Sequence, residues 1–282
     1  MMLIQSISEL ISVSQQLGGG FETVIRLNND SRKDVNSCIT SLVLRELQKR
    51  PGLAPPNVIN KAFDFLSSCA SSSTKGAYNF YPSEHNAQNI SVPSKITVPD
   101  DADDTALITL LLLQTGRITR NSIIRDTCIV LDKYRLPAVG NRDPHWFKAG
   151  AFYTWLEAGR NNMMDCCVNA NIVALYAYAG LQHLRGHKEA CRLISNAVNW
   201  CGRSATRLAS IMPFYADKQE LFYAVEHAVR MGAAELTPVL KKLEWANPKN
   251  EQFDADRSVC CSAYGKITWH CSLLQRLRNH SS

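Results

Sequence analysis

Segments that are apolar on all sides alternate along this chain with segments that carry charge on one side. Residues 102–115 and 164–181 are apolar nearly all round, whereas the segments that follow them, 120–134 and 187–201, each have a charged face. A helix that is apolar on every side must be buried on every side, while a helix with a charged face reaches the surface. The alternation therefore predicts an inner layer of helices wrapped by an outer layer.

Helical periodicity extends over most of the chain. Apolar residues recur at steps of three and four in the other segments, and a glycine follows several of them where a helix would end. We predict helices at about 2–17, 34–50, 57–70, 102–115, 120–134, 164–181, 187–201, 217–231, 236–246 and 262–278, with long connections at about 74–100 and 135–162. The expected fold is all-α: residues 1–282 form a single α/α toroid (barrel) domain of about 10–12 helices in inner and outer rings.

The composition excludes several classes of protein. The 282 residues are 45% hydrophobic and 20% charged, which is too apolar for a disordered chain and enough for a sizeable core. The net charge of +6 is scattered, without a basic block interleaved with aromatic residues, so we expect no nucleic-acid partner. The longest wholly apolar run, around Leu110–Leu113, is far shorter than the ~20 residues that a membrane helix needs.

The cysteines bear on the compartment. Ten are present, many of them inside predicted helices, where a free thiol behaves as a small hydrophobic group, and the N-terminus does not resemble a secretory signal. We therefore expect a cytoplasmic protein with reduced thiols. Peripheral contact with a membrane and assembly into a homo-oligomer stay open.

The helix predicted at 102–115 begins in a cluster of four aspartates, Asp100, Asp101, Asp103 and Asp104. One carboxylate suffices to cap a helix, and four so close together repel one another, which raises at least one pKa. A carboxylic acid that faces an apolar cavity is a general acid. Capping alone and the binding of a divalent metal by carboxylate oxygens are the two other interpretations.

The segment Asp101-Ala102-Asp103-Asp104-Thr105-Ala106 resembles the D-x-D-D-T-A motif of class II terpene cyclases, the squalene–hopene and copalyl diphosphate cyclase superfamily. The resemblance implies an α/α toroid in which Asp103 protonates a terminal alkene or epoxide, with Asp101 and Asp104 setting its protonation. It implies an isoprenoid substrate that cyclises as a carbocation. No cofactor would be required, and Mg²⁺ would take part only with a diphosphate substrate.

A second resemblance involves residues 159–167. They are similar to the G-R-x-N-K-x-x-D-x-C segment of protein prenyltransferase β-subunits, which share the α/α toroid. That resemblance implies contact of Arg160 with a diphosphate, and zinc bound by Asp165, Cys167 and His227. The match is incomplete because the lysine is replaced by Asn162. Without zinc, Asp165 would be a helix cap or a polar residue of the cavity mouth, and Cys167 a core thiol.

Further residues are candidates for contact with a substrate. Beside the aspartate cluster these are Arg160, Trp146, Phe152, Tyr153, Trp155, Asp165 and Asn169. Aromatic faces stabilise a carbocation by cation–π interaction, by up to about 2 kcal/mol each when desolvated. Packing in the core is the other interpretation of the aromatic residues.

The function expected from these features is protonation-initiated cyclisation of an isoprenoid. Class II cyclases usually have two or three helical domains, and this chain has room for one. A zinc-dependent, prenyltransferase-like toroid is the first alternative. The second is a non-catalytic helical scaffold that binds a lipid or a partner.

Overall fold

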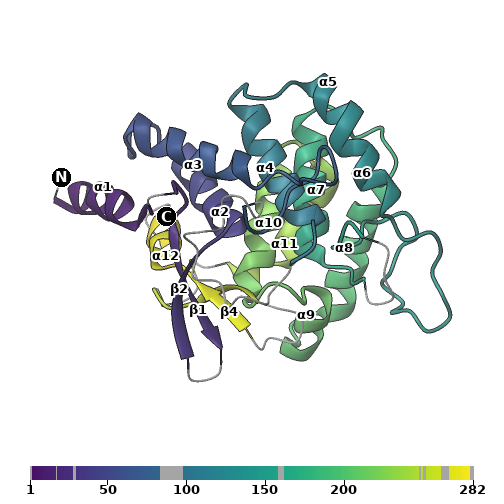
Figure 1. Ribbon diagram of the computed structural model, residues 1–282. Helices are drawn as coiled ribbons and strands as arrows, with labels where there is room; N and C mark the ends of the chain where they lie inside the picture. The colour runs from purple at the N-terminus through teal and green to yellow at the C-terminus, as the bar shows by residue number, and fades with distance from the viewer. Residues whose placement is uncertain are drawn as a thin grey trace.

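Four buried helices pack side by side in chain order: α2 (Ser37–Gln48), α4 (Ala102–Gln114), α7 (Cys166–Tyr178) and α10 (Lys218–Arg230). The computed structural model describes residues 2–16, 18–27, 30–82, 98–157, 162–247, 249, 252–261 and 267–279. All residues from Ala102 to Leu112, and from Cys166 to Ala177, are buried. The apolar composition of these helices on every side requires such a position (Figure 1).

The other helices cover this layer. α3 (Pro56–Ser68) packs on α2, α8 (His187–Cys201) on α7, and α11 (Thr237–Lys242) on α8 and α10. The remaining helices are α1 (Met2–Ser14), α5 (Arg120–Ser122), α6 (Cys128–Lys133), α9 (Ala205–Ile211) and α12 (Ser272–Asn279). Two 3-10 turns, Ala234–Leu236 and Glu244–Ala246, flank α11. α12 contacts both α1 and α2, so the first and the last helix of the described chain are neighbours (Figure 1).

The prediction of an all-α toroid is wrong, because the structure contains a four-stranded antiparallel sheet. Its strands are β1 (Glu22–Leu27), β2 (Asp30–Val35), β3 (Ser258–Cys261) and β4 (Ile267–His270), in the order β2-β1-β4-β3. β1, near the start of the chain, pairs with β4, near its end, so the two strands are far apart in sequence but adjacent in space. Helical periodicity carries no information on such a pairing, which depends on residues more than two hundred positions apart.

Several predicted helix boundaries also need correction. A helix was expected at 262–278, but the first described residues of this segment form β4. The sequence of β4, I-T-W-H, is rich in β-branched and aromatic residues, which favour a strand, and the helix begins only at Ser272. The helix expected at 34–50 begins at Ser37, because Asp34 belongs to β2 and the side chain of Asn36 caps the helix. A π turn at Ile123–Thr127 interrupts the helix expected at 120–134.

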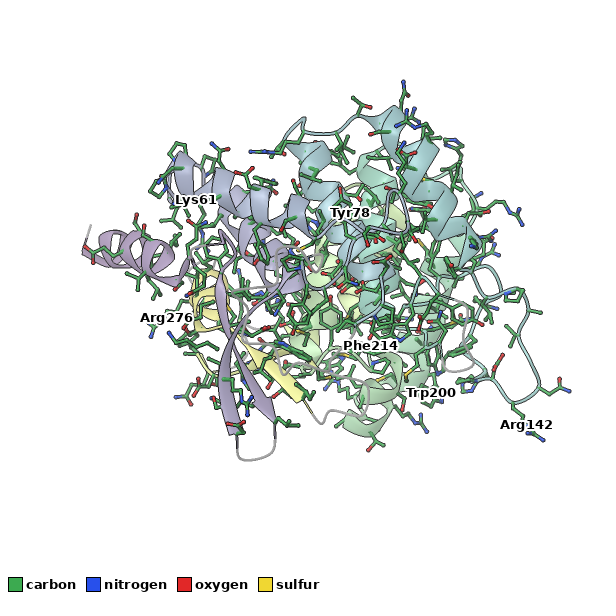
Figure 2. All side chains as sticks on the ribbon, in the orientation of Figure 1. Lys61, Tyr78, Arg142, Trp200, Phe214 and Arg276 are labelled. Atoms are coloured by element: carbon green, nitrogen blue, oxygen red, sulfur yellow. The ribbon has the colours of Figure 1, made fainter. Side chains whose placement is uncertain are left out.

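The two long connections are only partly described. Residues 83–97 of the first and 158–161 of the second lie outside the described residues. Within the described part of the second, the chain makes turns and isolated bridges, and Arg142 lies at the end of a loop that projects from the helices (Figure 2). Among the described helices, none combines the length and the apolar composition that crossing a bilayer would take.

Two hydrophobic clusters meet at α4. Ala106 and Leu110 belong to the cluster around α7, α8 and α10, whereas Leu107, Ile108 and Leu111 belong to the cluster around α2, α3 and the sheet. A single apolar helix therefore holds both halves of the core, and its N-terminus is placed where the two halves adjoin.

We expect Gly186→Ala to destabilise the fold by about 2–5 kcal/mol. Gly186 has φ +94°, and a Cβ there would come within 2.2 Å of Cζ of Phe152, a fully buried ring. The positive φ costs an L-residue about 1–2 kcal/mol, and overpacking adds about 1–3 kcal/mol. Gly180→Ala is the matched control, since Gly180 has φ +67° and open space around its Cα. Urea denaturation should show the larger loss for Gly186→Ala; equal losses would contradict the steric explanation.

Candidate functional site

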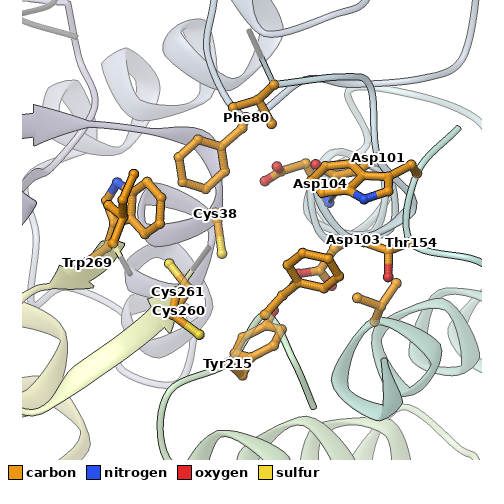
Figure 3. A pocket seen from close by; sticks show the side chains of 15 residues that line it. Cys38, Phe80, Asp101, Asp103, Asp104, Thr154, Tyr215, Cys260, Cys261 and Trp269 are labelled. Atoms are coloured by element: carbon orange, nitrogen blue, oxygen red, sulfur yellow. Dashed lines mark hydrogen bonds between the residues drawn. The ribbon is translucent and has the colours of Figure 1, made fainter. Parts of the chain in front are cut away.

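A cavity of about 160 Å³ lies at the N-terminal ends of α2, α4 and α7. Five aromatic side chains line it, Phe80, Trp155, Phe214, Tyr215 and Trp269, together with Cys38, Val98, Thr154, Val168, Cys260, Cys261 and Ile267. The carboxyl groups in the lining are Asp101, Asp103 and Asp104. Figure 3 shows these carboxyls on one side of the cavity, with Trp269 and the thiols of the sheet on the other. The cavity is thus apolar apart from the acid cluster.

Backbone pairing places the aspartate cluster against the loop that carries Trp155. The amide of Ala102 donates to the carbonyl of Thr154 at 2.8 Å, and Asp101 and Trp155 form a bridge. On the opposite wall, the amide of Cys261 donates to the carbonyl of Phe214 at 2.9 Å. These bonds attach two loops to α4 and to β3, and so fix the walls of the cavity.

Asp101 and Asp104 lie one helical turn apart at the start of α4. Asp101 is the N-cap, and its Oδ1 accepts from the backbone N–H of Asp104 at 2.7 Å. Burial, then the charges of Asp104 and Asp103, raise the pKa of Asp101 well above its ordinary value. Burial raises the pKa of Asp104 to about 7, although Ser37 donates a hydrogen bond of 2.7 Å to its Oδ1. Protons are therefore retained here near neutral pH.

Asp103 has different partners. Nδ2 of Asn171 donates to its Oδ1 at 2.7 Å, and the hydroxyl of Tyr215 donates to its Oδ2. Burial raises the pKa of Asp103, and the hydrogen bonds from Tyr215 and Asn171, followed by the charge of Arg45, lower it. The three carboxyls of one motif thus experience two distinct environments.

The pKa of Asp104 predicts how stability changes with pH. Between its ordinary value of 3.8 and about 7, the folded protein keeps a proton on Asp104 that the unfolded chain has released. Since the folded state binds more protons in this window, its stability falls as the pH rises from about 4 to about 7. We expect Asp104→Asn to reduce this slope, measured by urea denaturation at a series of pH values. A variant with the slope of the wild type would contradict the assignment.

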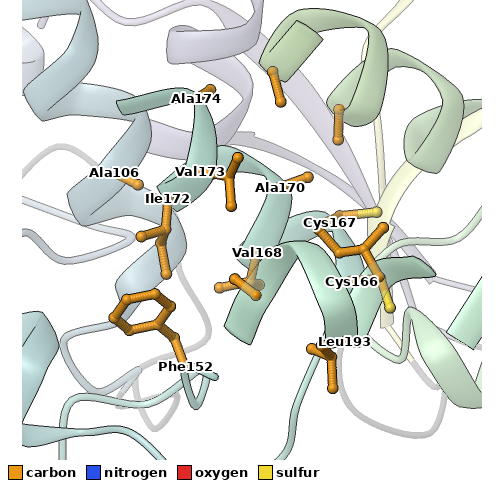
Figure 4. Packing of buried hydrophobic residues seen from close by; sticks show 14 of the residues in the cluster. Ala106, Phe152, Cys166, Cys167, Val168, Ala170, Ile172, Val173, Ala174 and Leu193 are labelled. Atoms are coloured by element: carbon orange, nitrogen blue, oxygen red, sulfur yellow. The ribbon is translucent and has the colours of Figure 1, made fainter. Parts of the chain in front are cut away.

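Of the aromatic residues predicted to contact a substrate, Trp155 lines the cavity and the others lie elsewhere. Trp146 is buried and stacks on Trp200 with ring centroids 6.2 Å apart. Phe152 is fully buried edge-on to Tyr176, and Figure 4 shows its ring beside Ile172 in the packed cluster around α7. Tyr153 is half-buried and is not part of the lining. For Trp146 and Phe152, packing in the core is therefore the role that the structure gives.

The predicted polar residues hold the backbone around the cavity. Asn169 accepts from the N–H of Phe152 at 3.0 Å and donates to its carbonyl at 2.9 Å. Asp165 is the N-cap of α7, accepting from Cys167 at 2.6 Å, and it also accepts from the N–H of Phe214 at 3.0 Å. Burial raises its pKa to about 7. Arg160 lies outside the described residues.

The residues proposed for zinc do not form a ligand set. The described residues, which include Asp165, Cys167 and His227, contain no group of three or more histidine, cysteine or acidic side chains placed to hold a metal ion. Instead, Asp165 is engaged by backbone amides, and Nδ1 of His227 lies 3.0 Å from Arg230. All ten cysteines are free thiols.

Sequence reasoning missed several residues of the cavity. Asn171, which holds Asp103 behind the lining, is one of two asparagines, with Asn169, in a helix that is otherwise apolar, and this contrast is a signal that could have identified it. Tyr215 lies two residues before the helix predicted at 217–231, where nothing in the sequence distinguishes it. Trp269 and Cys260 come from the sheet, and the wrong prediction of a helix at 262–278 concealed the first of them.

Comparisons with known proteins do not indicate a function, so the function has to be inferred from the chemistry of the site. No protein-family model and no curated protein match the sequence. Among solved structures, a crystal structure of a protein from Actinoplanes aligns with 100% of this chain and 99% of its own, at 12% sequence identity and a TM-score of 0.47.

Proposed function

We propose that the cavity binds an isoprenoid and protonates one of its double bonds, so that the resulting carbocation cyclises. The observation that carries this proposal is the placement of Asp101, Asp103 and Asp104 in an otherwise apolar, aromatic cavity. A proton donor to an alkene must be un-ionised when the substrate arrives. Burial acts in this direction, since it raises the pKa of all three groups.

The aromatic lining supports the same reaction. Trp155, Phe214 and Trp269 line the space in which positive charge would develop, and each desolvated cation–π contact is worth up to about 2 kcal/mol. The D-x-D-D-T-A motif, similar to that of class II terpene cyclases, is the segment that supplies the carboxyls. The hydrocarbon would enter the cavity, and a diphosphate, where present, would be held outside it with Mg²⁺, because the carboxylates repel an anion.

Solvent deuterium gives a direct test. The full chain is incubated in D₂O with squalene and with geranyl, farnesyl and geranylgeranyl diphosphates, each with and without Mg²⁺, and the products are analysed by mass spectrometry after phosphatase treatment. We expect a cyclised product that has taken up deuterium from the solvent at the protonated carbon. A product formed by loss of diphosphate without such uptake would refute the proposal. Absence of any product would favour a non-catalytic scaffold that binds lipid.

A further inference from the structure

The size of the cavity bears on what the proposed reaction can produce. Its volume of about 160 Å³ is close to that of an engineered cavity of about 150 Å³, lined by aliphatic and aromatic side chains, that takes up benzene. The lining here is of the same apolar kind, apart from Asp101, Asp103 and Asp104. A space of this size holds one six-membered ring, and a second fused ring exceeds it.

The helical wall of the cavity is rigid. Asp103 and Val168 lie in the first turns of α4 and α7, both are buried, and the two helices pack against each other. Oδ1 of Asp103 accepts from Nδ2 of Asn171 at 2.7 Å, which ties α4 to α7 beside the cavity. Because packed protein interiors have low compressibility, this wall keeps its position when a ligand enters.

The aromatic side chains of the other walls are held by contacts of their own. Nε1 of Trp269 donates to Asp34 at 3.0 Å, and its ring meets that of Phe80 edge to face with centroids 5.3 Å apart. The rings of Trp155 and Phe214 likewise meet edge to face, with centroids 5.2 Å apart. The cavity is therefore preformed, and its volume limits the ligand.

Phe214 is fixed through its backbone. Its N–H donates to Oδ2 of Asp165 at 3.0 Å, and its carbonyl accepts from the N–H of Cys261 at 2.9 Å. The next residue, Tyr215, forms a bridge with Cys260. Since these bonds use backbone atoms of Phe214, they persist when its ring is removed. Phe214→Ala therefore enlarges the cavity and leaves the backbone of its walls in place.

We propose that the cavity limits the reaction to a single ring: the terminal part of the isoprenoid closes to one six-membered ring inside it, and the rest of the chain stays outside. The inference rests on the proposed function and names its product class, a monocyclic terpenoid. An aspartate O–H bond breaks, and its proton forms a C–H bond with the π electrons of the terminal double bond. The π electrons of the next double bond form the C–C bond that closes the ring, and the new cation loses a proton to water. The product is an isomer of the substrate with one double bond fewer.

The binding of unreactive hydrocarbons tests the size limit without turnover. Benzene and naphthalene are titrated into the full chain by isothermal titration calorimetry. Without a size limit naphthalene would bind more tightly, because it buries more apolar surface. Since overpacking is unfavourable, we expect the reverse order, with naphthalene weaker than benzene by about tenfold or more. Naphthalene that binds as tightly as benzene, or absence of benzene binding, would overturn the inference.

An enlarged variant locates the size limit in this cavity. In Phe214→Ala, naphthalene should bind at least as tightly as benzene. Phe147→Ala is the matched control: Phe147 is also half-buried, with its ring edge-on to Trp146, but it is not part of the lining, so the order of the wild type should persist. An unchanged order in Phe214→Ala, with the circular dichroism spectrum of the wild type, would contradict a limit set by the cavity.

The number of double bonds in the product tests the single ring itself. After reaction with farnesyl diphosphate and phosphatase treatment, the product is hydrogenated and analysed by mass spectrometry. We expect it to take up one molecule of hydrogen fewer than farnesol. A bicyclic product of the wild type, which takes up two fewer, would overturn the single-ring limit and support the proposed cyclisation. Absence of product from every isoprenoid would refute the proposed function and, with it, the ring closure.

Discussion

Asp103→Asn should lower the rate of the proposed cyclisation by about 10²–10⁴-fold, the range of general acid–base catalysis, and leave the fold intact. The amide has the size of the carboxyl and can still accept from Asn171 and donate to Tyr215, so packing is preserved. What disappears is the carboxyl itself, whether it acts as the acid or as the charge that stabilises the cation. Product formation by mass spectrometry and the circular dichroism spectrum are the two measurements.

The neighbouring aspartates provide a graded control. Asp104→Asn should weaken cyclisation less than Asp103→Asn, and Asp100→Asn least, because Asp100 does not line the cavity. If Asp103→Asn kept full activity on a substrate that the wild type cyclises, Asp103 would have no part in the reaction. If the variant unfolded, its role would be structural.

Glu220→Gln should lower the free energy of unfolding by about 3–5 kcal/mol, which is the cost of removing one partner from a buried ion pair. Glu220 of α10 accepts two hydrogen bonds from Arg278 of α12, and the side chains are 2% and 1% exposed. The variant keeps the shape of the side chain but leaves the guanidinium buried without its counter-charge. Urea denaturation followed by circular dichroism measures the loss.

Two further variants separate charge from packing. Replacing both partners by methionine should cost less than Glu220→Gln alone, because no uncompensated charge stays buried. Lys33→Gln is the exposed counterpart: Lys33 pairs with Glu22 at 2.8 Å but its side chain is 77% exposed, so we expect a loss below about 1 kcal/mol. Equal effects of Glu220→Gln and Lys33→Gln would contradict the importance of burial.

The buried helices were accessible to sequence reasoning because their composition is local information. The apolar runs of α4 and α7 identify helices that must be covered on every side, and acidic residues at or next to the predicted starts, Asp101, Asp165 and Asp217, are the N-caps of α4, α7 and α10. Asp34 was different. It lies at the end of β2, where its carboxylate accepts from Nε1 of Trp269 at 3.0 Å, a contact between the two ends of the chain.

The acid cluster was likewise visible in the sequence, whereas most of the cavity around it was not. The density of carboxylates in one helical turn is a local property of the sequence. The repulsion among these groups is unfavourable enough to require an explanation. Which side chains complete the walls depends on the pairing of β1 with β4 and of the 155 region with Asp101. Trp146 and Phe152 are aromatic and near in sequence to Trp155, yet the path of the loop turns them into the core.

The sequence by itself determined which helices are buried and which segment carries the aspartate cluster, because hydrophobic periodicity and charge density act over one or two helical turns. Only the tertiary structure decided that a sheet is added to the helices, since its hydrogen bonds join strands from opposite ends of the chain. It also decided how the three carboxyls differ. Ser37, Asn171 and Tyr215, which donate hydrogen bonds to them, are remote from them in sequence, and the energy of a buried charge depends on the few groups that lie within contact distance of it.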